Sequence, residues 1–243
     1  MKLTMKKTLE ILYEDNQIIA VDKPSGVLTQ QDSSGSESLL DMVREYIREK
    51  YSKPGRVFLG LVHRLDRQVS GVVVFARTSK AASRLFREFH QRSVLKIYCA
   101  LVHRPAEVPA DDHGDEWVYL FNDLVRRGSK TVLAPSQGES VNAALAYKLI
   151  AANDRYMLLL VKLLTGRKHQ IRAQLSAAGM PVAGDRRYGS PEVYPDKSIC
   201  LHSYLLRVMH PTAGRVVEIT ARIPDRIRMR IEVPEIDPHL REP

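Results

Sequence analysis

Cysteine is scarce in this sequence. Its 243 residues include only two cysteines, Cys99 and Cys200, which stand far apart and show no Cys-x-x-Cys or Cys/His ligand spacing. A disulfide framework or a structural zinc site needs more such ligands at closer spacing. We therefore expect two buried, reduced thiols, as in a cytoplasmic protein, and no bound metal.

Long apolar runs are missing as well. No stretch approaches the run of about 18 apolar residues that a membrane span requires. The first residues, MKLTMKKTLEILYEDN, are basic at the start but contain no apolar segment of useful length and soon turn acidic. This is not the form of a secretory signal. We expect neither a membrane protein nor a secreted one.

Acidic residues are outnumbered by basic ones. Lys and Arg total 37 against 28 Asp and Glu, which gives a formal net charge of +9. An excess of cations favours a polyanionic partner, with nucleic acid first among the candidates. Charge alone does not separate that partner from the solubility of an ordinary basic protein.

Hydrophobic periodicity predicts many short strands and few helices. The expected strands are two within 9–21, the apolar runs 71–77 and 96–102, a hairpin of 140–150 and 155–164, and three more near 200–210, 215–223 and 229–233. The expected helices start at Ser36 or Ser38, at Ser79 (ending near His90) and at about Lys168 (ending at Gly179). Residues 103–140 show the least regularity. We expect one α+β domain over 1–243, built on a mixed, largely antiparallel sheet flanked by helices.

The stretch HRLDRQVSG, His63 to Gly71, sets the carboxylate of Asp66 between Arg64 and Arg67. Alternate side chains of an extended segment share a face, so Arg64 and Asp66 should point one way and His63 the other. A surface ion pair worth about 0–1 kcal/mol would explain the pattern. The alternative is that Asp66 lies in a pocket and Arg64 reaches a phosphate or an unstacked base.

A second polar cluster, TGRKHQIR, opens the predicted helix near Lys168. Helix N-termini attract anions through their free N–H groups and the helix dipole. His169 and Arg172 are three residues apart and so share one helix face. Polar groups that gather at the ends of strands and helices are typical of a built site.

These segments together resemble the RluA-type RNA pseudouridine synthases. LEILYEDNQIIAVDKPSG is similar to the family's first motif, HRLDRQVSGVVVFAR to its second, KIYCALV to its tyrosine segment and LLTGRKHQIRAQLSAAGMPVAGDRRYG to its third. The resemblance covers roughly residues 9 to 220 in the family's order and spacing. It departs at Val69, where the family usually has threonine, and we expect no separate S4-like RNA-binding domain before the first motif.

The resemblance implies that the chain isomerises uridine to pseudouridine in structured RNA, either rRNA or tRNA. It assigns the catalytic carboxylate to Asp66, its guanidinium partner to Arg172, and a base-stacking, proton-relaying tyrosine to Tyr98. Whether Asp66 attacks the base, attacks the sugar or assists loss of the C2′ proton stays open. An isomerisation needs no cofactor and no metal, and we expect none.

Seven further residues are expected to contact RNA: Lys23, His63, Arg64, Arg167, Lys168, His169 and Gln170. The partner is therefore RNA, and the protein is expected to be a monomer. A non-catalytic RNA-binding or RNA-remodelling module with the same basic cleft is the alternative. An aspartate-dependent hydrolase is disfavoured, because such enzymes pair the aspartate with a second carboxylate or a metal.

Overall fold

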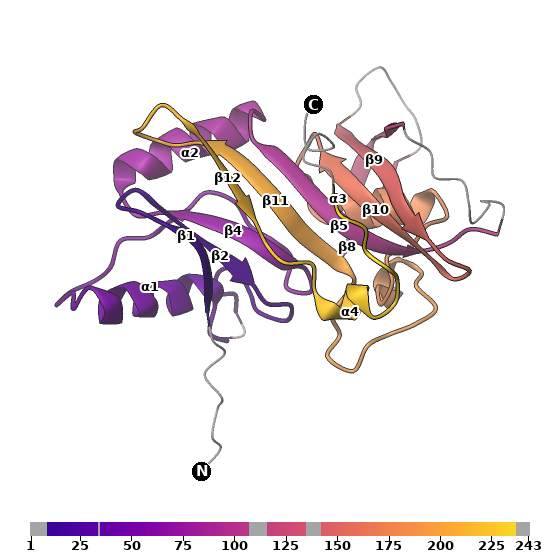
Figure 1. Ribbon diagram of the computed structural model, residues 1–243, viewed down its shortest axis with the longest axis horizontal. Helices are drawn as coiled ribbons and strands as arrows, with labels where there is room; N and C mark the ends of the chain where they lie inside the picture. Colours follow the sequence, from indigo (N-terminus) through magenta and orange to yellow (C-terminus); the bar gives the residue numbers. More distant parts are fainter. Residues whose placement is uncertain (1–8, 34, 107–115, 135–141, 237–243) are drawn as a thin grey trace, which may run out of the picture.

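The computed structural model describes residues 9–33, 35–106, 116–134 and 142–236. Their core is a ten-stranded sheet in the order β1-β2-β4-β11-β5-β10-β9-β6, with β12 added to β11 and β3 to β4 (Figure 1). Of the strand pairs described, only β4 with β11 is parallel. The predicted α+β class with a mixed, largely antiparallel sheet is confirmed. No helix within the described ranges has both the length and the hydrophobicity needed to cross a membrane.

The first hairpin and helix form where the sequence predicts them. Strands β1 (Glu10–Glu14) and β2 (Ile18–Lys23) are antiparallel neighbours. Helix α1 (Leu39–Lys50) begins after Ser38. The Ser38 hydroxyl accepts a hydrogen bond from the Asp41 amide, and the Asp41 carboxylate accepts one from the Ser38 amide. This capping box satisfies two helix-end donors, which explains why Ser38 and not Ser36 starts the helix.

Two helices cover opposite faces of the sheet around strand β4 (Ser70–Ala76), which lies beside the short β3 (Gly60–Leu61). Successive side chains of a strand point to opposite faces. Val73 therefore joins the hydrophobic cluster that contains α1 residues, whereas Val74 joins the cluster that contains residues of α2 (Ser79–Gln91). In Figure 1, α1 and α2 accordingly lie on either side of β1, β2 and β4.

Beyond β11 the sheet continues with the antiparallel set β5 (Leu95–His103), β10 (Tyr156–Leu163) and β9 (Ala143–Ala152). β9 and β10 form the predicted hairpin. Cys99, on β5, and Cys200 are both free and buried. Strands β11 (Leu201–Met209) and β12 (Val216–Thr220) also follow the prediction.

Gly71 allows the one parallel pair of the sheet. Its φ is +113°, and a Cβ at this position would lie 2.2 Å from the carbonyl oxygen of Ser203. Only glycine tolerates both that backbone conformation and that approach. The second motif is thereby held directly against β11 at the start of β4, and its loop at 63–69 is fixed to the sheet at that end.

Two regions differ from the prediction. Residues 229–233 form no strand, because Pro224 starts a short helix, α4 (Asp225–Arg228), whose last turn takes in Met229. The supposedly irregular region 103–140 contains three strands: β6 (Val118–Asn122), β7 (Leu124–Arg127) and β8 (Lys130–Leu133). β6 is an edge strand on β9, and β7 and β8 form a separate hairpin. Most of the acidic stretch 104–117 lies outside the described residues.

Helix α3 (Gln170–Ala177) starts two residues later than predicted. The cause is His169, whose φ of +54° is left-handed and cannot belong to the helix. The helix ends before Gly179 at φ +78°, as predicted. A 3₁₀ turn, η1 (Arg186–Tyr188), follows in what was expected to be a loop. The start of α3 is buried, so its polar side chains face protein groups.

Candidate active site

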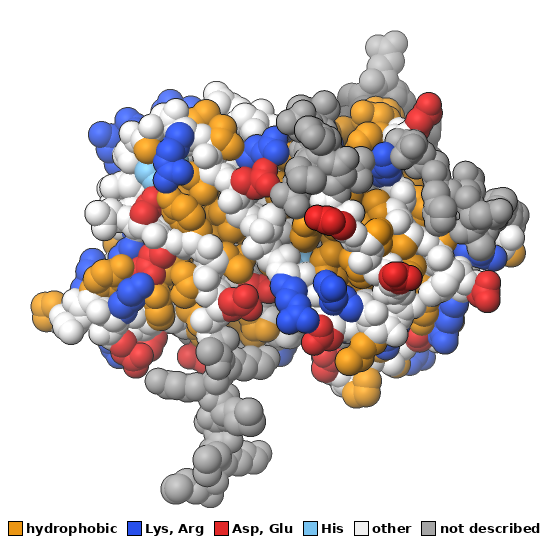
Figure 2. All heavy atoms as spheres, viewed as in Figure 1, with side chains coloured by type: hydrophobic (Ala, Val, Ile, Leu, Met, Phe, Trp, Pro, Cys, Tyr) orange, Lys and Arg blue, Asp and Glu red, His pale blue; other side chains and the backbone are white. Residues whose placement is uncertain are grey.

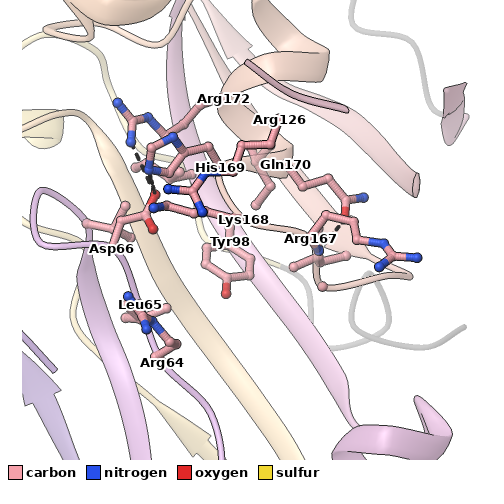
Figure 3. A pocket seen from close by; sticks show the side chains of 15 residues that line it. Arg64, Leu65, Asp66, Tyr98, Arg126, Arg167, Lys168, His169, Gln170 and Arg172 are labelled. Atoms are coloured by element: carbon pink, nitrogen blue, oxygen red, sulfur yellow. Dashed lines mark hydrogen bonds and ion pairs between the residues drawn. The ribbon is translucent and has the colours of Figure 1, made fainter. Parts of the chain in front are cut away.

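A cavity of about 420 Å³ lies where the loop before β4, strand β5 and the start of α3 meet (Figure 3). The residues that line it come from the second motif, the tyrosine segment, the third motif, β7 and the start of β11: Arg64, Leu65, Asp66, Val69, Tyr98, Arg126, Leu163, Gly166, Arg167, Lys168, His169, Gln170, Ile171, Arg172 and Leu201. On the face seen in Figures 1 and 2, cationic and anionic side chains are interspersed. In contrast, the described lining contains several cations and a single carboxylate.

The loop that carries Asp66 is held by Ser25, at the end of the first motif, and by Thr29, which follows it. The Thr29 hydroxyl donates to the Leu65 carbonyl at 2.9 Å and accepts from the Leu65 amide at 3.2 Å. The Ser25 hydroxyl donates to the Gln68 carbonyl at 2.8 Å. Val69 is buried in the main hydrophobic cluster. Thr29 and Ser25 therefore hold the loop in place, and no hydroxyl at position 69 is needed for this.

Lys23 belongs to the same support. Its side chain is fully buried, and its ammonium donates to the carbonyls of Val27 at 2.7 Å, Pro24 at 3.1 Å and Arg67 at 3.3 Å. A buried ammonium needs such internal acceptors. The expected RNA contact of Lys23 is corrected on this ground: the residue joins the first-motif loop to the loop that carries Asp66 and does not line the cavity.

Asp66 is paired with Arg172, as the sequence predicts. Nη1 of Arg172 lies 3.1 Å from Oδ2 of Asp66, although 106 residues separate them. The same guanidinium makes a bidentate pair with Asp185, with Nε–Oδ2 at 2.6 Å and Nη2–Oδ1 at 2.9 Å. Nη2 also donates to the side-chain oxygen of Gln68 at 3.2 Å. Asp185 thus fixes the plane of the guanidinium and aims one edge of it at Asp66.

The environment keeps Arg172 charged. Its side chain is 2% exposed and that of Asp185 is 1% exposed, whereas Asp66 opens to the cavity at 22%. Burial by itself lowers the pKa of Arg172, but the hydrogen bonds and charges of Asp185 and Asp66 outweigh burial and raise it. The Tyr188 ring packs 4.8 Å below the guanidinium and excludes water from that side.

His169 is a second neighbour of Asp66, with Nε2 3.4 Å from Oδ2. The Tyr188 hydroxyl accepts from the Thr131 amide at 2.9 Å and lies 2.9 Å from Nδ1 of His169. Among the described residues, that hydroxyl has no other acceptor for its proton than Nδ1. Nδ1 is therefore the unprotonated nitrogen, and Nε2 carries the N–H that faces the carboxylate.

Burial lowers the pKa of His169 to about 4; Asp66 opposes this effect, and the cations nearby add to it. The imidazole is thus neutral at neutral pH. Its side chain is only 7% exposed. The RNA contact expected of His169 is replaced by a contact with the carboxylate.

Tyr98 projects from β5 into the cavity below Asp66 (Figure 3). Burial raises the pKa of Tyr98 to about 12, Asp66 adds to the rise, and a hydrogen bond with Ser203 opposes it. The phenol is therefore protonated at neutral pH, and it offers a hydrogen-bond donor and a flat ring to the cavity.

The other RNA-contact predictions divide by exposure. Arg64, Arg167 and Lys168 are exposed and line the cavity. Gln170 also lines it but is 2% exposed, and both atoms of its amide are committed to protein groups: Thr165, Arg167, Ala144 and Gln174. Its predicted RNA contact is corrected, because no polar capacity is left for a ligand.

His63 does not line the cavity. Its Nε2 accepts from the Val74 amide at 3.0 Å, and its ring stacks on Phe89 of α2 at 4.6 Å. This agrees with the alternation that turns His63 away from Arg64 and Asp66. Its RNA contact stays a prediction, which these contacts within the protein do not support.

Sequence reasoning missed Asp185, Tyr188, Gln68 and Arg126. The first two stand in GDRRYG, within the third motif. Their polar side chains were the available signal, but the sequence analysis predicts only a loop there. Gln68 lies within the second motif, but no role was predicted for it. Arg126 stands in a region without any motif, so only the fold brings it to the cavity.

Comparisons with known proteins agree with these motifs. The family model described as RNA pseudouridylate synthase matches residues 17–177. The dual-specificity RNA pseudouridine synthase RluA of Escherichia coli is 34% identical over 222 residues, which cover 88% of this chain and 92% of that protein. The ribosomal large subunit pseudouridine synthase C of Salmonella typhi is 29% identical, with 92% and 69% covered. A solved structure, human RNA pseudouridylate synthase domain containing 4, has a TM-score of 0.71 at 22% identity, covers 93% and 95% of the two chains, and shows the same fold.

Proposed function

The chain belongs to the RluA-type family of RNA pseudouridine synthases, and from that premise we propose that Asp66 is the group that acts on the target uridine, with Arg172 and Tyr98 as its partners. Membership makes the chain an enzyme that isomerises uridine in RNA to pseudouridine. The observation that carries the residue assignment is the 3.1 Å contact between Asp66 and Arg172 at a cavity wall. That contact leaves the rest of the carboxylate open to a ligand.

The reaction breaks the N1–C1′ bond, turns the uracil and joins C5 to C1′. One proton leaves C5 and one is gained at N1, so the product is an isomer of the substrate. A carboxylate is suited to this sequence as a nucleophile or as a stabiliser of a cationic sugar. Asp66 is the one carboxylate among the described residues that line the cavity. The charge of Arg172, fixed by Asp185, stabilises the carboxylate when it departs from the reacting carbon.

Tyr98 supplies a flat ring and a protonated phenol. Because its pKa is raised to about 12, we assign it stacking and hydrogen-bond donation rather than general-base action at neutral pH. A uridine must leave its stack to reach the cavity, which costs a few kcal/mol. The exposed Arg64 is suited to fill the vacated space, and Arg167 and Lys168 to hold the neighbouring phosphates.

The proposed substrate is a uridine in structured rRNA or tRNA, since RNA is read through shape and unstacked bases. The printed names of the relatives point to RNA generally and to the large ribosomal subunit in particular, each for its own protein. We further propose that the enzyme acts as a monomer in the cytoplasm. Mapping pseudouridines in a strain that lacks this protein would identify the RNA, and light scattering would test the monomer.

The assignment of Asp66 is tested by release of tritium from RNA labelled at uridine C5. The wild type is expected to release label, and Asp66→Asn to release none while it still binds RNA. Asn keeps the shape of the side chain but can neither attack nor carry charge. Tight binding without release by the wild type would favour the non-catalytic RNA-binding alternative. Release by Asp66→Asn at the wild-type rate would refute the role of Asp66.

A further inference from the structure

His169 stands at the start of helix α3, at the place where a side chain normally caps the helix. Ser, Thr, Asp and Asn are preferred there because they accept hydrogen bonds from the first free amides. His169 has a left-handed backbone, with φ +54°, and its side chain makes no capping hydrogen bond. Residues held in such a strained conformation are concentrated at functional sites. The imidazole is therefore directed to a use away from the helix end.

The two nitrogens of this imidazole have two different partners. Nδ1 accepts the proton of the Tyr188 hydroxyl at 2.9 Å, so the N–H is on Nε2, which lies 3.4 Å from Oδ2 of Asp66. This distance is longer than an ordinary N–H···O bond, but catalytic hydrogen bonds often tighten only when a substrate is bound. Because burial lowers the pKa of His169 to about 4, the donor is neutral. It faces the carboxylate without adding a full positive charge to that of Arg172.

Both donors of Asp66 contact the same oxygen. Nη1 of Arg172 lies 3.1 Å from Oδ2, the atom that Nε2 of His169 also approaches. Within the described ranges, no hydrogen bond or ion pair from another residue reaches Oδ1. In Figure 3 the oxygen of Asp66 that carries no dashed line lies on the side of Tyr98. A carboxylate turns easily about its Cβ–Cγ bond, and two donors on Oδ2 restrict that rotation.

We propose that His169 is a positioning residue for the reaction: together with Arg172 it holds Oδ2 of Asp66, so that Oδ1 is the oxygen presented to the uridine. The inference rests on the proposed function, because it takes Asp66 as the group that acts. A reacting atom that is already held in place does not lose that freedom in the transition state. His169 thus acts through Asp66. The alternative is that His169 only accepts the proton of Tyr188 and so holds the turn beside Arg172.

Two amide variants separate the roles of the two nitrogens. In His169→Gln the amide nitrogen can reach the place of Nε2, which keeps the donor to Asp66 but removes the acceptor for Tyr188. In His169→Asn the shorter amide places its oxygen near Nδ1, which keeps the acceptor for Tyr188 but removes the donor. Both side chains are neutral and unbranched, and asparagine is tolerated in the left-handed region. The proposal requires Gln to be the active variant, and the alternative requires Asn.

The readouts are kcat and apparent KM for tritium release, together with urea unfolding. The probe is C5-tritiated RNA from a strain that lacks this protein. His169→Asn should lose about 10-fold to 100-fold in kcat, the rate equivalent of one hydrogen bond to a charged group. Its KM should hardly change, because the residue does not hold the RNA. His169→Gln should recover most of the lost kcat. Full activity of His169→Asn, or an equal loss in both variants when both are folded, would overturn the proposal.

A third variant tests the same donor if an amide variant fails to fold. His169→Gly suits the left-handed backbone and leaves space for a ring beside the cavity. Imidazole added to this variant supplies an acceptor and an N–H, whereas N-methylimidazole supplies the acceptor alone. Imidazole should restore kcat and N-methylimidazole should not; rescue by both compounds or by neither would count against the donor role. Failure of the proposed function would look different, because Asp66→Asn would then release tritium at the wild-type rate.

Discussion

The position of Arg172 between two carboxylates predicts that its roles in stability and in catalysis can be separated. The perturbation is Arg172→Met, which keeps much of the side-chain volume but removes the charge. It leaves Asp185, 1% exposed, without its bidentate partner, and Asp66 without its cation. The second variant, Arg172→Met/Asp185→Asn, also removes the buried carboxylate charge but leaves Asp66 as isolated as before.

The magnitudes follow from burial and distance. An unpaired buried charge costs about 3–5 kcal/mol, which lowers the melting temperature of a chain of this size by roughly 6–20 °C. With Asp185 neutral, only lost hydrogen bonds remain, at about 1–3 kcal/mol. For Asp66, two charges 3.1 Å apart at an effective dielectric of about 20 interact by about 5 kcal/mol. Because Asp66 is 22% exposed, we count about half of that, which is about 100-fold in rate.

The assays are urea unfolding and tritium release on the same preparations. Arg172→Met should lose both stability and activity. The double variant should regain about 2 kcal/mol of stability and none of the roughly 100-fold activity loss. If activity returned together with stability, Arg172 would act only by holding the fold. If Arg172→Met unfolded no more readily than the wild type, Asp185 would not be the uncompensated charge that its burial indicates.

Two further predictions concern protons. Tyr188→Phe leaves the buried Thr131 amide without an acceptor, which should lower the stability by about 1–3 kcal/mol. It also removes the hydroxyl that donates to Nδ1 of His169, so the pKa of His169 should rise from about 4. Tritium release by this variant should then fall below about pH 6 relative to the wild type, since an imidazolium would bind Asp66 as an ion pair; an unchanged pH profile would contradict the assigned tautomer. His202 is fully buried, and burial lowers its pKa to about 4. The unfolded state, with an ordinary histidine pKa near 6.5, binds the proton first, so stability should fall as pH drops from about 6.5 to about 4, by about 2 kcal/mol at pH 5. Urea unfolding at pH 7 and 5 measures this loss, which His202→Asn should reduce.

Local signals predicted the regular elements well. The capping serine and the apolar face of α1, the all-apolar β4 and the β9–β10 hairpin each depend on residues close together in the sequence. Strands β6, β7 and β8 were missed because they are short and lie at the edge of the sheet or outside it, where no face needs an apolar pattern. The strand expected at 229–233 had the pattern but lacked a neighbouring strand, which the sequence does not reveal.

For the site, the resemblance paired Asp66 with Arg172 across 106 residues, which no local pattern could have done. It did not reveal Asp185, which orients Arg172, because that contact depends on how the GDRRYG turn packs under α3. The tautomer of His169 also could not be predicted from the sequence. It depends on an amide of β8, from a strand that was not foreseen.

The polar residues of the motifs separate into two groups, and burial decides which group each one joins. A buried cation must find its acceptors inside the protein, so Lys23 binds carbonyls and Arg172 binds carboxylates. An exposed cation gains little from the fold and stays available to phosphate, as do Arg64 and Lys168. Residue type alone makes these groups look alike. The buried group holds the carboxylate and its loop rigid before RNA arrives, so binding energy from the exposed group need not be used to order the site.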